Sequence, residues 1–444
     1  MPFSPLDSAI FSPLFSDAAV AAIFSDEQFA RHMLTVESAL ARVEARLAII
    51  PATAGQQISS AAGELSLDFN RLRSATESDG FPVIELVRQL RVQVGHETAG
   101  YVHWGATTQD IMDTALVLQI RAGLDVLEDN LRKLTLGLAE LALRHRHTLM
   151  SGRTHSQQAL PVTFGFKVAN WLAPLLRQRQ RLAELKPRLL VVQFGGAVGT
   201  LAALGENGLN VQNALADELK LSVLSMPWHT QRDGLLELAG WLSLLSGSLA
   251  KLAQDILLLA QTEIAEAREA ADGTRGGSST MPQKGNPIVS ETIVAAARAN
   301  ASLLASMHQA QLQEHERATG SWQLEWLALP QMFGLTAGAL QRSLFLCENL
   351  VVNEQQMQRN VAASHGLMLA EGLSFELARS MSRAQAEQLV REACLVAVRQ
   401  DRHLLDVVRE RFKGPADWPV LQKEADYLGA AQSFIDRVVQ AAKS

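Results

Sequence analysis

Leu235–Ala267 reads LLELAGWLSLLSGSLAKLAQDILLLAQTEIAEA, and this stretch decides the fold class. It lies in a predicted helix that runs from Thr230 to about Glu269. Over its first half the apolar residues leave almost no polar face, and a helix that is apolar on every side is surrounded by other helices. One chain of 444 residues rarely supplies enough neighbours. We therefore expect other copies of the chain to cover part of this helix.

Helical periodicity continues along most of the chain, and the alternation typical of strands is scarce. The first helix follows Ser25, which has Gln28 three residues on as in a capping box, and Pro51 stops it. Further long helices are predicted over roughly Gln109–His147, over Pro161–Leu185 with a kink at Pro174, from Pro287 onward and after Gly320. The predicted fold class is all-α, with a central bundle of long helices.

The lengths of the predicted helices divide the chain into three parts. Residues 1–105 form an N-terminal helical domain, residues 106–345 a central helix-bundle domain that includes the segment 276–287, and residues 346–444 a C-terminal helical domain. The long helices lie in the middle part, and shorter helices flank it.

Composition and charge exclude several classes of protein. Hydrophobic residues make up 48% and charged residues 19% of the chain, as in a globular protein with a substantial core. The formal net charge of -6 argues against nucleic-acid binding, which needs a basic surface. Cys347 and Cys394 form no metal-like cluster, and the N-terminus lacks the features of a signal peptide. We expect a cytoplasmic protein without a membrane span.

Residues 276–287 read GGSSTMPQKGNP and carry the strongest chemical signal. So much glycine, serine and proline excludes a helix interior, which predicts a loop between two long helices with Pro287 in the first turn of the second. A glycine-rich loop can direct several backbone N–H groups at one anion. Lys284 adds a positive charge and Asn286 a neutral donor. The alternative interpretation is a flexible surface linker.

Residues 152–161, GRTHSQQALP, are predicted to form another loop between long helices. His155 has Thr154 and Gln157 near it, and such a group suits the handling of charge near a carboxylate. A single loop histidine is more often a solvated or structural residue. Both interpretations stay open at this point.

Residues 103–110, HWGATTQD, lead into the helix that begins near Gln109. Thr107 and Asp110 have capping-box spacing, so helix capping alone would explain them. The functional interpretation uses the same helix N-terminus, whose free N–H groups and positive dipole end attract a substrate carboxylate. Thr107 and Thr108 are then candidates to line a substrate site.

Three weaker polar stretches have a structural interpretation by default. Residues 193–200, QFGGAVGT, are predicted to form a turn between helices. Residues 228–233, WHTQRD, and 315–317, HER, are predicted to cap helices or to form salt bridges between subunits.

These segments together resemble the fumarase/aspartase superfamily. Its signature pattern, Gly-Ser-Ser-x-Met-Pro-x-Lys-x-Asn-Pro, is matched at every fixed position from Gly277 to Pro287. The segments around Thr107 and His155 resemble the superfamily's other two conserved regions, in the expected order. The resemblance implies an elongated three-domain subunit with a five-helix central bundle. It also implies a homotetramer with a twenty-helix core, whose active sites take their three segments from three subunits.

Within the superfamily, the chain resembles most the cycloisomerase branch, on stretches such as residues 24–47, 227–233 and 313–326. This branch closes 3-carboxy-cis,cis-muconate into 4-carboxymuconolactone in protocatechuate breakdown, by intramolecular addition of a carboxylate to a conjugated alkene. Adenylosuccinate lyase shares the GRTH and HER-type segments, so it or another C–N or C–O lyase of the superfamily is the alternative. A non-catalytic structural protein of this fold is disfavoured because Ser278 and Lys284 are present.

The resemblance also implies roles for single residues. Ser278 would exchange the proton beside the carboxylate, and Lys284 and Asn286 would bind a substrate carboxylate. The candidates to line the pocket are Thr107, Thr108, His155 and Gln157.

His155 also counts as a catalytic candidate. In a cycloisomerase it would only orient or bind, because a carboxylate with a reference pKa near 4 needs no proton to leave. The expected partner is a small polycarboxylate. No cofactor or metal is expected, because no Rossmann fingerprint, P-loop or metal-ligand spacing is visible.

Overall fold

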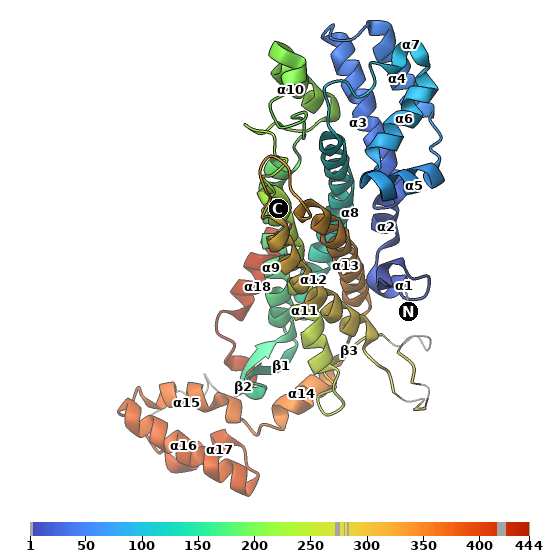
Figure 1. The fold of residues 1–444 in the computed structure, drawn as a ribbon. Helices are drawn as coiled ribbons and strands as arrows, with labels where there is room; N and C mark the ends of the chain where they lie inside the picture. The colour runs from blue at the N-terminus through green and yellow to red at the C-terminus, as the bar shows by residue number, and fades with distance from the viewer. Residues whose placement is uncertain (1–2, 271–275, 279, 282–283, 415–422, 444) are drawn as a thin grey trace. The chain divides into compact units, whose positions relative to one another are not determined.

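The computed structural model describes residues 3–270, 276–278, 280–281, 284–414 and 423–443. These residues are mainly helical (Figure 1) and form two compact units. Unit 1 comprises residues 1–130, 178–247 and 295–341, and unit 2 comprises residues 131–177, 248–294 and 342–444. Each of the long helices contributes residues to both units. The predicted division into three domains stays a prediction.

The long helices are α8 (Thr108–Arg144), α9 (Phe164–Leu189), α11 (Asp233–Leu259), α12 (Ile288–Ala310) and α13 (Ser321–Asn349). Their existence confirms what the helical periodicity predicts. Several boundaries are wrong. The helix predicted from Pro161 begins at Phe164, because Pro161 lies in a strand. The helix predicted over Thr230–Glu269 spans Asp233–Leu259, and the first helix ends at Arg46 rather than at Pro51.

The shorter helices of unit 1 are α1 (Ser12–Phe15), α2 (Ala18–Ile23), α3 (Asp26–Arg46), α4 (Ala52–Glu64), α5 (Phe69–Asp79), α6 (Val83–Val94), α7 (His96–Ala99) and α10 (Gly208–Leu219). The predicted cap of α3 is confirmed, since the Ser25 Oγ accepts the Gln28 N–H at 3.3 Å. Helices α3 and α4 pack closely at Gly55, where a Cβ would lie 2.4 Å from the Ala45 Cβ.

Buried polar bonds tie the long helices of unit 1 together. The Asn300 amide on α12 donates to the Thr336 Oγ1 on α13 at 2.8 Å and to the Ser246 Oγ on α11 at 3.2 Å. The Trp241 indole on α11 donates to the Gln178 carbonyl on α9 at 3.0 Å. Because a buried donor without a partner is costly, these bonds fix which helix faces meet.

Unit 2 contains the strands of the described chain, β1 (Leu149–Thr154), β2 (Gln157–Thr163), β3 (Ala267–Arg268) and β4 (Val351–Val352). The β1–β2 and β3–β4 pairs are both antiparallel. The loop predicted over residues 152–161 is therefore wrong, since this segment forms most of a hairpin. Its strands carry a bulge between Ser151 and Arg153, which weakens the alternation on which a sequence-based prediction depends.

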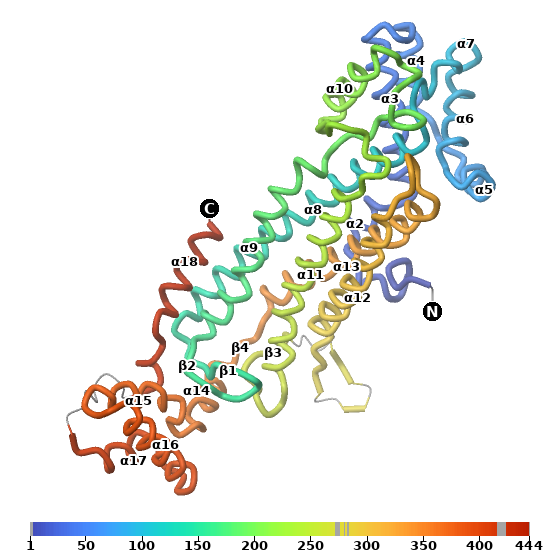
Figure 2. Tube along the Cα trace, turned by 60° about the vertical axis from the view of Figure 1, so that its left-hand side comes forward, coloured from blue at the N-terminus to red at the C-terminus, as the bar shows by residue number. Residues whose placement is uncertain are grey.

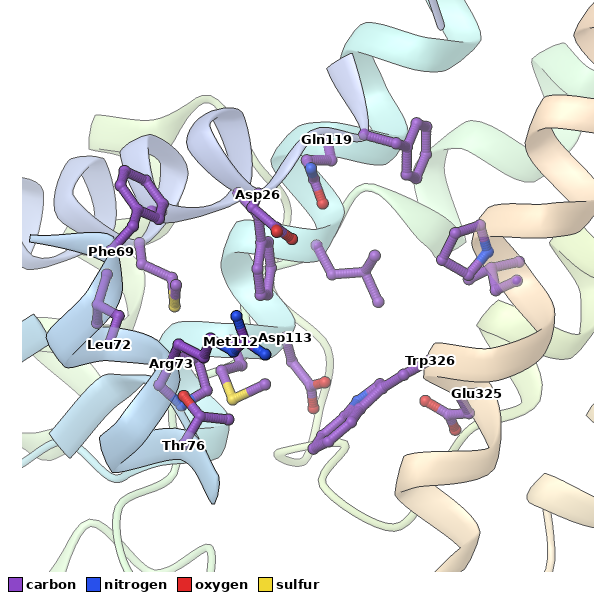
Figure 3. A pocket seen from close by; sticks show the side chains of 18 of the residues that line it. Asp26, Phe69, Leu72, Arg73, Thr76, Met112, Asp113, Gln119, Glu325 and Trp326 are labelled. Atoms are coloured by element: carbon purple, nitrogen blue, oxygen red, sulfur yellow. The ribbon is translucent and has the colours of Figure 1, made fainter. Parts of the chain in front are cut away.

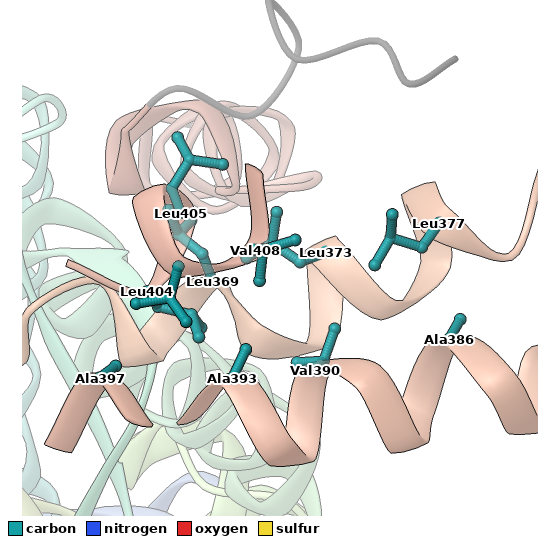
Figure 4. Close-up of a cluster of buried hydrophobic side chains, with 11 residues drawn as sticks. Leu369, Leu373, Leu377, Ala386, Val390, Ala393, Ala397, Leu404, Leu405 and Val408 are labelled. Carbon is teal, nitrogen blue, oxygen red and sulfur yellow. The ribbon is translucent and has the colours of Figure 1, made fainter. Parts of the chain in front are cut away.

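The remaining helices of unit 2 are α14 (Glu354–Ala362), α15 (Ala370–Leu377), α16 (Arg383–Gln400), α17 (Leu404–Arg411) and α18 (Ala431–Lys443). Helices α15, α16 and α17 lie side by side (Figure 2) around a buried cluster that includes Leu373, Val390 and Leu404 (Figure 4). Small alanines on α16, such as Ala386 and Ala393, let the neighbouring leucines approach its backbone. Four short 3-10 helices complete the described elements: η1 (Pro5–Asp7), η2 (Ala202–Asn207), η3 (Leu367–Leu369) and η5 (Glu424–Asp426).

Two helices, α11 and α12, are long and apolar enough to cross a membrane by length and composition alone. The core helices of globular proteins pass the same test. Within the chain, only 44% of the tested window of α11 and 39% of that of α12 is buried. Leu258 on α11 stays 46% exposed. The prediction that α11 needs more neighbours than one chain supplies is consistent with this partial burial.

Candidate active site

Thr107 and Thr108 lie where α8 begins. Thr108 is the first residue of the helix, and the Thr107 N–H donates to the Asp110 Oδ2 at 3.0 Å. This bond is one half of a capping box, so the structural interpretation of the Thr107–Asp110 spacing is confirmed. Both threonines remain partly exposed, which leaves them accessible to a substrate.

The Asp110 carboxylate is fully buried and anchors the N-terminus of α8. It accepts the N–H groups of Gly195 and Gly196 at 2.9 Å each, the Gln193 amide at 3.3 Å and the His229 Nε2 at 2.7 Å. Residues from the turn 193–200 and from the segment 228–233 therefore position the threonines. For residues 193–200 this agrees with the predicted turn, whereas residues 228–233, predicted to cap helices or to form salt bridges between subunits, bond to residues of their own chain.

Arg232 forms the main buried ion pairs of unit 1. Its guanidinium binds both oxygens of Asp113 at 2.6 and 3.0 Å and both oxygens of Glu325 at 2.8 and 2.6 Å, and it stacks on the Trp228 ring. Burial works against the charge, but the two carboxylates outweigh it and raise the pKa of Arg232. The sequence predicts helix caps or salt bridges between subunits for this segment. In the structure, Arg232 instead forms its salt bridges within unit 1.

A buried glutamate of α3, Glu37, contacts the segment that leads to Thr107 and Thr108. The Glu37 Oε1 on α3 contacts the His103 Nδ1 at 2.6 Å. Burial disfavours the charged imidazole, but Glu37 outweighs it and raises the pKa of His103. The nearby Glu44 carboxyl has both oxygens buried without a hydrogen-bond partner among the described residues. Burial and the charge of Glu37 raise the pKa of Glu44 to about 9.

His155 and Gln157 lie at the tip of the β1–β2 hairpin in unit 2. His155 and Ser156 form the two-residue turn, with φ of 49° and 62°. Positive φ at both central residues is typical of a type I′ turn, which fits the twist of a hairpin. The His155 and Gln157 side chains are exposed. The turn therefore presents the imidazole outward.

Arg153 fixes the hairpin to the rest of unit 2. Its guanidinium binds the fully buried Glu266 carboxylate through two bonds, of 2.7 and 2.8 Å. The Asn360 amide donates to the Glu266 Oε1 at 2.8 Å. A charged pair with this bidentate geometry holds both partners in one orientation. Arg153 is thus a positioning residue for His155.

The signature segment is closed at its base by one backbone bond. The Asn286 N–H donates to the Gly276 carbonyl at 2.8 Å. Gly276 has φ of 70°, and a Cβ there would lie 2.4 Å from the Asn286 carbonyl oxygen, so only glycine fits. The predicted loop is confirmed for the described residues of the segment, and Ser279, Pro282 and Gln283 lie outside them.

Ser278 is half-exposed within this loop. Its Oγ accepts the Met281 N–H at 3.1 Å and lies 3.4 Å from the Thr280 nitrogen. Backbone donors of this kind favour a negatively polarised oxygen. Lys284 is exposed, and its N–H donates to the Met281 carbonyl at 3.0 Å. Among the described residues of unit 2, the Lys284 side chain has no ion-pair partner, so the ammonium group is open to an anion.

The predicted site residues fall into two groups. Thr107 and Thr108 belong to unit 1, whereas His155, Gln157 and the signature loop belong to unit 2. Among the described residues of unit 2, no hydrogen bond joins the hairpin tip to Ser278. The described residues also contain no group of three or more His, Cys, Asp or Glu side chains that could hold a metal ion.

Sequence reasoning missed the residues that hold the candidates in place. Arg153 lies in the segment 152–161, but the sequence does not indicate its role, because its partner Glu266 lies 113 residues away in the chain. Glu37 and Glu44 did carry a signal. Their spacing of seven residues puts both acids on one helix face, and the neighbouring Leu34 and Leu40 are apolar and buried.

Comparisons with known proteins agree with the geometry of these segments. The family model described as "Lyase" matches residues 16–299. The 3-carboxy-cis,cis-muconate cycloisomerase of Pseudomonas aeruginosa is 46% identical over 438 residues, which cover 97% of this chain and 95% of that protein. The trans-aconitate decarboxylase 1 of Mycosarcoma maydis is 40% identical, with 98% of this chain and 89% of that protein covered.

A solved structure leads to the same conclusion. The 3-carboxy-cis,cis-muconate lactonizing enzyme from Pseudomonas putida superposes with a TM-score of 0.91 at 42% identity, covering 98% of this chain and 99% of that one. A match of this length and identity shows the family as well as the fold. The chain belongs to the lyase family of the fumarase/aspartase superfamily.

Proposed function

We propose that this protein is a cycloisomerase that converts 3-carboxy-cis,cis-muconate to 4-carboxymuconolactone. One observation carries the proposal: the chain matches enzymes of that name over nearly its whole length, at 46% identity to the Pseudomonas aeruginosa enzyme. The exposed signature loop with Ser278 and Lys284 supplies the groups that such a reaction needs.

The reaction adds a carboxylate oxygen across a carbon–carbon double bond conjugated to another carboxylate. Negative charge then builds up on that second carboxylate as an enolate-like dianion, and a proton arrives on the adjacent carbon. Preorganised donors lower the energy of such a species most. We assign this task to Lys284 and Asn286, with Thr107 and Thr108 at the N-terminus of α8 binding a further carboxylate.

Ser278 is the group that we propose to exchange the proton. A serine hydroxyl has a high pKa in water, so it works as an oxyanion only among donors that stabilise its charge. The Met281 N–H, 3.1 Å from the Ser278 Oγ, is such a donor. In lactone formation the hydroxyl gives its proton to the carbon, and in the reverse direction the oxyanion takes it back.

We further propose that the enzyme is a cytoplasmic homotetramer whose active sites take their segments from different subunits. Leu258 on α11 and Leu327 on α13 are 46% and 65% exposed in the single chain. Large apolar side chains on core helices are more often covered in an assembly than left in water. Assembly would also bring residues of other subunits against the exposed hairpin tip and signature loop.

The test is turnover of three substrates by the purified enzyme. With 3-carboxymuconate we expect loss of diene absorbance and a lactone that retains every carbon atom, with one of the three carboxylates now part of the lactone ring. The likeness to the trans-aconitate decarboxylase makes decarboxylation the second candidate, and it would release CO2 from trans-aconitate. Adenylosuccinate, which would yield AMP, tests the C–N lyase alternative. A higher kcat/KM with either competitor than with 3-carboxymuconate would contradict the proposal.

A further inference from the structure

Unit 1 contains a cavity of about 660 Å³ that none of the predicted site residues lines. Its walls come from α3, α5, α8 and α13 (Figure 3). This volume falls within the usual range for small-molecule pockets. Met112 and Leu116, which line it, follow Thr108 by one and two turns of α8. The cavity is thus separate from the candidate active site but shares a helix with it.

One wall of the cavity is aromatic and rigid. Trp322 and Trp326 on α13 lie with ring centroids 5.0 Å apart in an edge-on arrangement, and Phe81 stacks on Trp322 at 5.4 Å. The Trp322 indole N–H is also fixed, because it donates to the Asp113 Oδ1 at 3.2 Å. Side chains held this firmly offer a preformed face for another flat ring.

The buried acids of the cavity are already satisfied. Asp113 accepts bonds from Arg232, Trp322 and the Gln109 amide, and both oxygens of Glu325 bind Arg232. Neither carboxylate therefore needs a cation from a ligand. The remaining acid of the lining is Asp26, which is exposed.

The opposite wall is formed by polar side chains on one face of α5, of which Asn70 and Arg73 are exposed to solvent. Asn70, Arg73 and Thr76 recur at a spacing of three residues, so all three face the cavity. Arg73 has no ion-pair partner among the residues that the structure describes, and Figure 3 shows it beside the same opening as Asp113 and Trp326. A guanidinium binds a carboxylate through two parallel bonds.

We propose that this cavity is a second, non-catalytic binding site for a small aromatic monocarboxylate. The ring packs on Trp326, which Trp322 supports through their edge-on contact, and the carboxylate binds Arg73. A tricarboxylate such as the proposed substrate fits poorly, because one guanidinium faces the site and Asp26 repels the additional charges. Ligand binding to this cavity is independent of the proposed function and is measurable without turnover.

The test measures binding of benzoate, benzyl alcohol and acetate to the whole protein by calorimetry. Benzoate should bind saturably, benzyl alcohol about tenfold more weakly because it lacks the charge, and acetate not measurably because it lacks the ring. Arg73→Gln should weaken benzoate about tenfold and leave benzyl alcohol unchanged. Arg31→Gln is the matched control, because Arg31 lies on α3, outside the lining residues.

A second variant tests the cavity independently in case Arg73→Gln does not fold. Trp326→Leu removes a ring from the wall and should weaken both aromatic probes, while Arg73 remains in place. Circular dichroism checks that each variant is folded. Absence of saturable benzoate binding to the wild type would overturn the proposal, and so would equal benzoate affinity in wild type and Arg73→Gln. Equal affinity of the wild type for benzoate and benzyl alcohol would assign the cavity to neutral rings instead.

Discussion

Ser278 is the single residue on which the proposed chemistry depends most. Replacing it by alanine removes the proposed proton donor without touching a helix core. We expect Ser278→Ala to lower kcat with 3-carboxymuconate by about 10²–10⁴-fold, as is typical for loss of a general acid or base. Ser302→Ala, an exposed serine on α12, is the matched control. A near-wild-type kcat in Ser278→Ala would show that another group moves the proton.

The raised pKa of Glu44 predicts how the stability of the protein, rather than its activity, depends on pH. Burial, with the charge of Glu37, raises the pKa of Glu44 from 4.5 to about 9 in the folded protein. Unfolding between these pH values therefore releases a proton. The stabilising contribution is fully present below about pH 4.5 and is lost as the pH rises toward 9, by about 1.4 kcal/mol per pH unit.

Glu44→Gln mimics the protonated glutamate and should therefore reduce the loss of stability with rising pH. Urea unfolding at pH 6 and pH 8, at one fixed protein concentration, measures the effect. The wild type should lose more stability between the two pH values than the variant does. Glu64→Gln changes an exposed glutamate on α4 and should behave as the wild type. Parallel pH dependences in Glu44→Gln and wild type would mean that Glu44 is ionised in the folded protein.

At the scale of elements, the helices could be predicted from the sequence and the hairpin could not. Apolar residues recur with helical spacing over long stretches, so α8, α11 and α13 are visible from periodicity alone. The β1 strand is short, contains Gly152 and is interrupted by a bulge. Its pairing partner also contains Pro161. Such a strand is stabilised mainly by its pairing, and its own residues show no pattern from which it could be predicted.

The candidate site divides in the same way. Its candidate residues stand in short contiguous motifs, so Thr107, His155 and Ser278 could be proposed from the sequence. The groups that position them are far apart in the chain, as Asp110 and Gly195 are, or Arg153 and Glu266. Such pairs are created by tertiary packing, and one sequence gives no signal for them.

A substitution of Gly276 tests whether activity requires the closed base of the signature loop. Gly276→Ala introduces a Cβ 2.4 Å from the Asn286 carbonyl oxygen at a backbone φ of 70°, so the base of the loop must open. We expect kcat to fall at least about tenfold while the helical circular dichroism is retained. In Gly277→Ala the new Cβ meets no atom of the described residues within 4 Å, which makes this variant the matched control. Equal kcat in both variants would argue against a role for the closed base.

A substitution of His155, at the hairpin tip, distinguishes a cycloisomerase from a C–N lyase. A lyase must protonate its departing amine, so loss of the histidine should lower its kcat by about 10²–10⁴-fold. In a cycloisomerase, His155→Gln should reduce kcat/KM only about tenfold, because the carboxylate is already ionised. Measurements of kcat and KM from pH 6 to pH 8 distinguish the two.

His155→Asn serves as a second variant at this position, because asparagine tolerates the positive φ of the turn better than glutamine. Agreement between the two variants would assign the effect to the imidazole rather than to a strained turn. A thousandfold fall in kcat with unchanged KM in both would identify His155 as an obligatory proton carrier.

At the scale of the whole molecule, the apolar helices are only partly covered by their own chain. Less than half of the apolar window of α11 is buried, and that of α12 is buried still less. Every square ångström of apolar surface removed from water contributes about 25 cal/mol, so association of such helices is favourable. The proposal of shared active sites adds that this association brings the hairpin tip of one copy to the signature loop of another.

Subunit mixing tests this idea directly. One parent carries Ser278→Ala, and the other carries His155→Ala together with Gln157→Ala, so each lacks one segment of the site. If every site takes its hairpin and its loop from different subunits, random assembly of equal amounts gives intact pairs in about a quarter of the sites. Activity should therefore rise toward a quarter of the wild-type value and above that of either parent.

The control is a mixture of two separately tagged preparations of Ser278→Ala, which contains no intact loop and should stay inactive. Co-purification of the two tags proves that subunits have exchanged. A site built from one chain would gain nothing from mixing, since every chain lacks either its loop serine or its hairpin side chains. Exchange without recovered activity would therefore exclude shared sites, even if the protein is a tetramer.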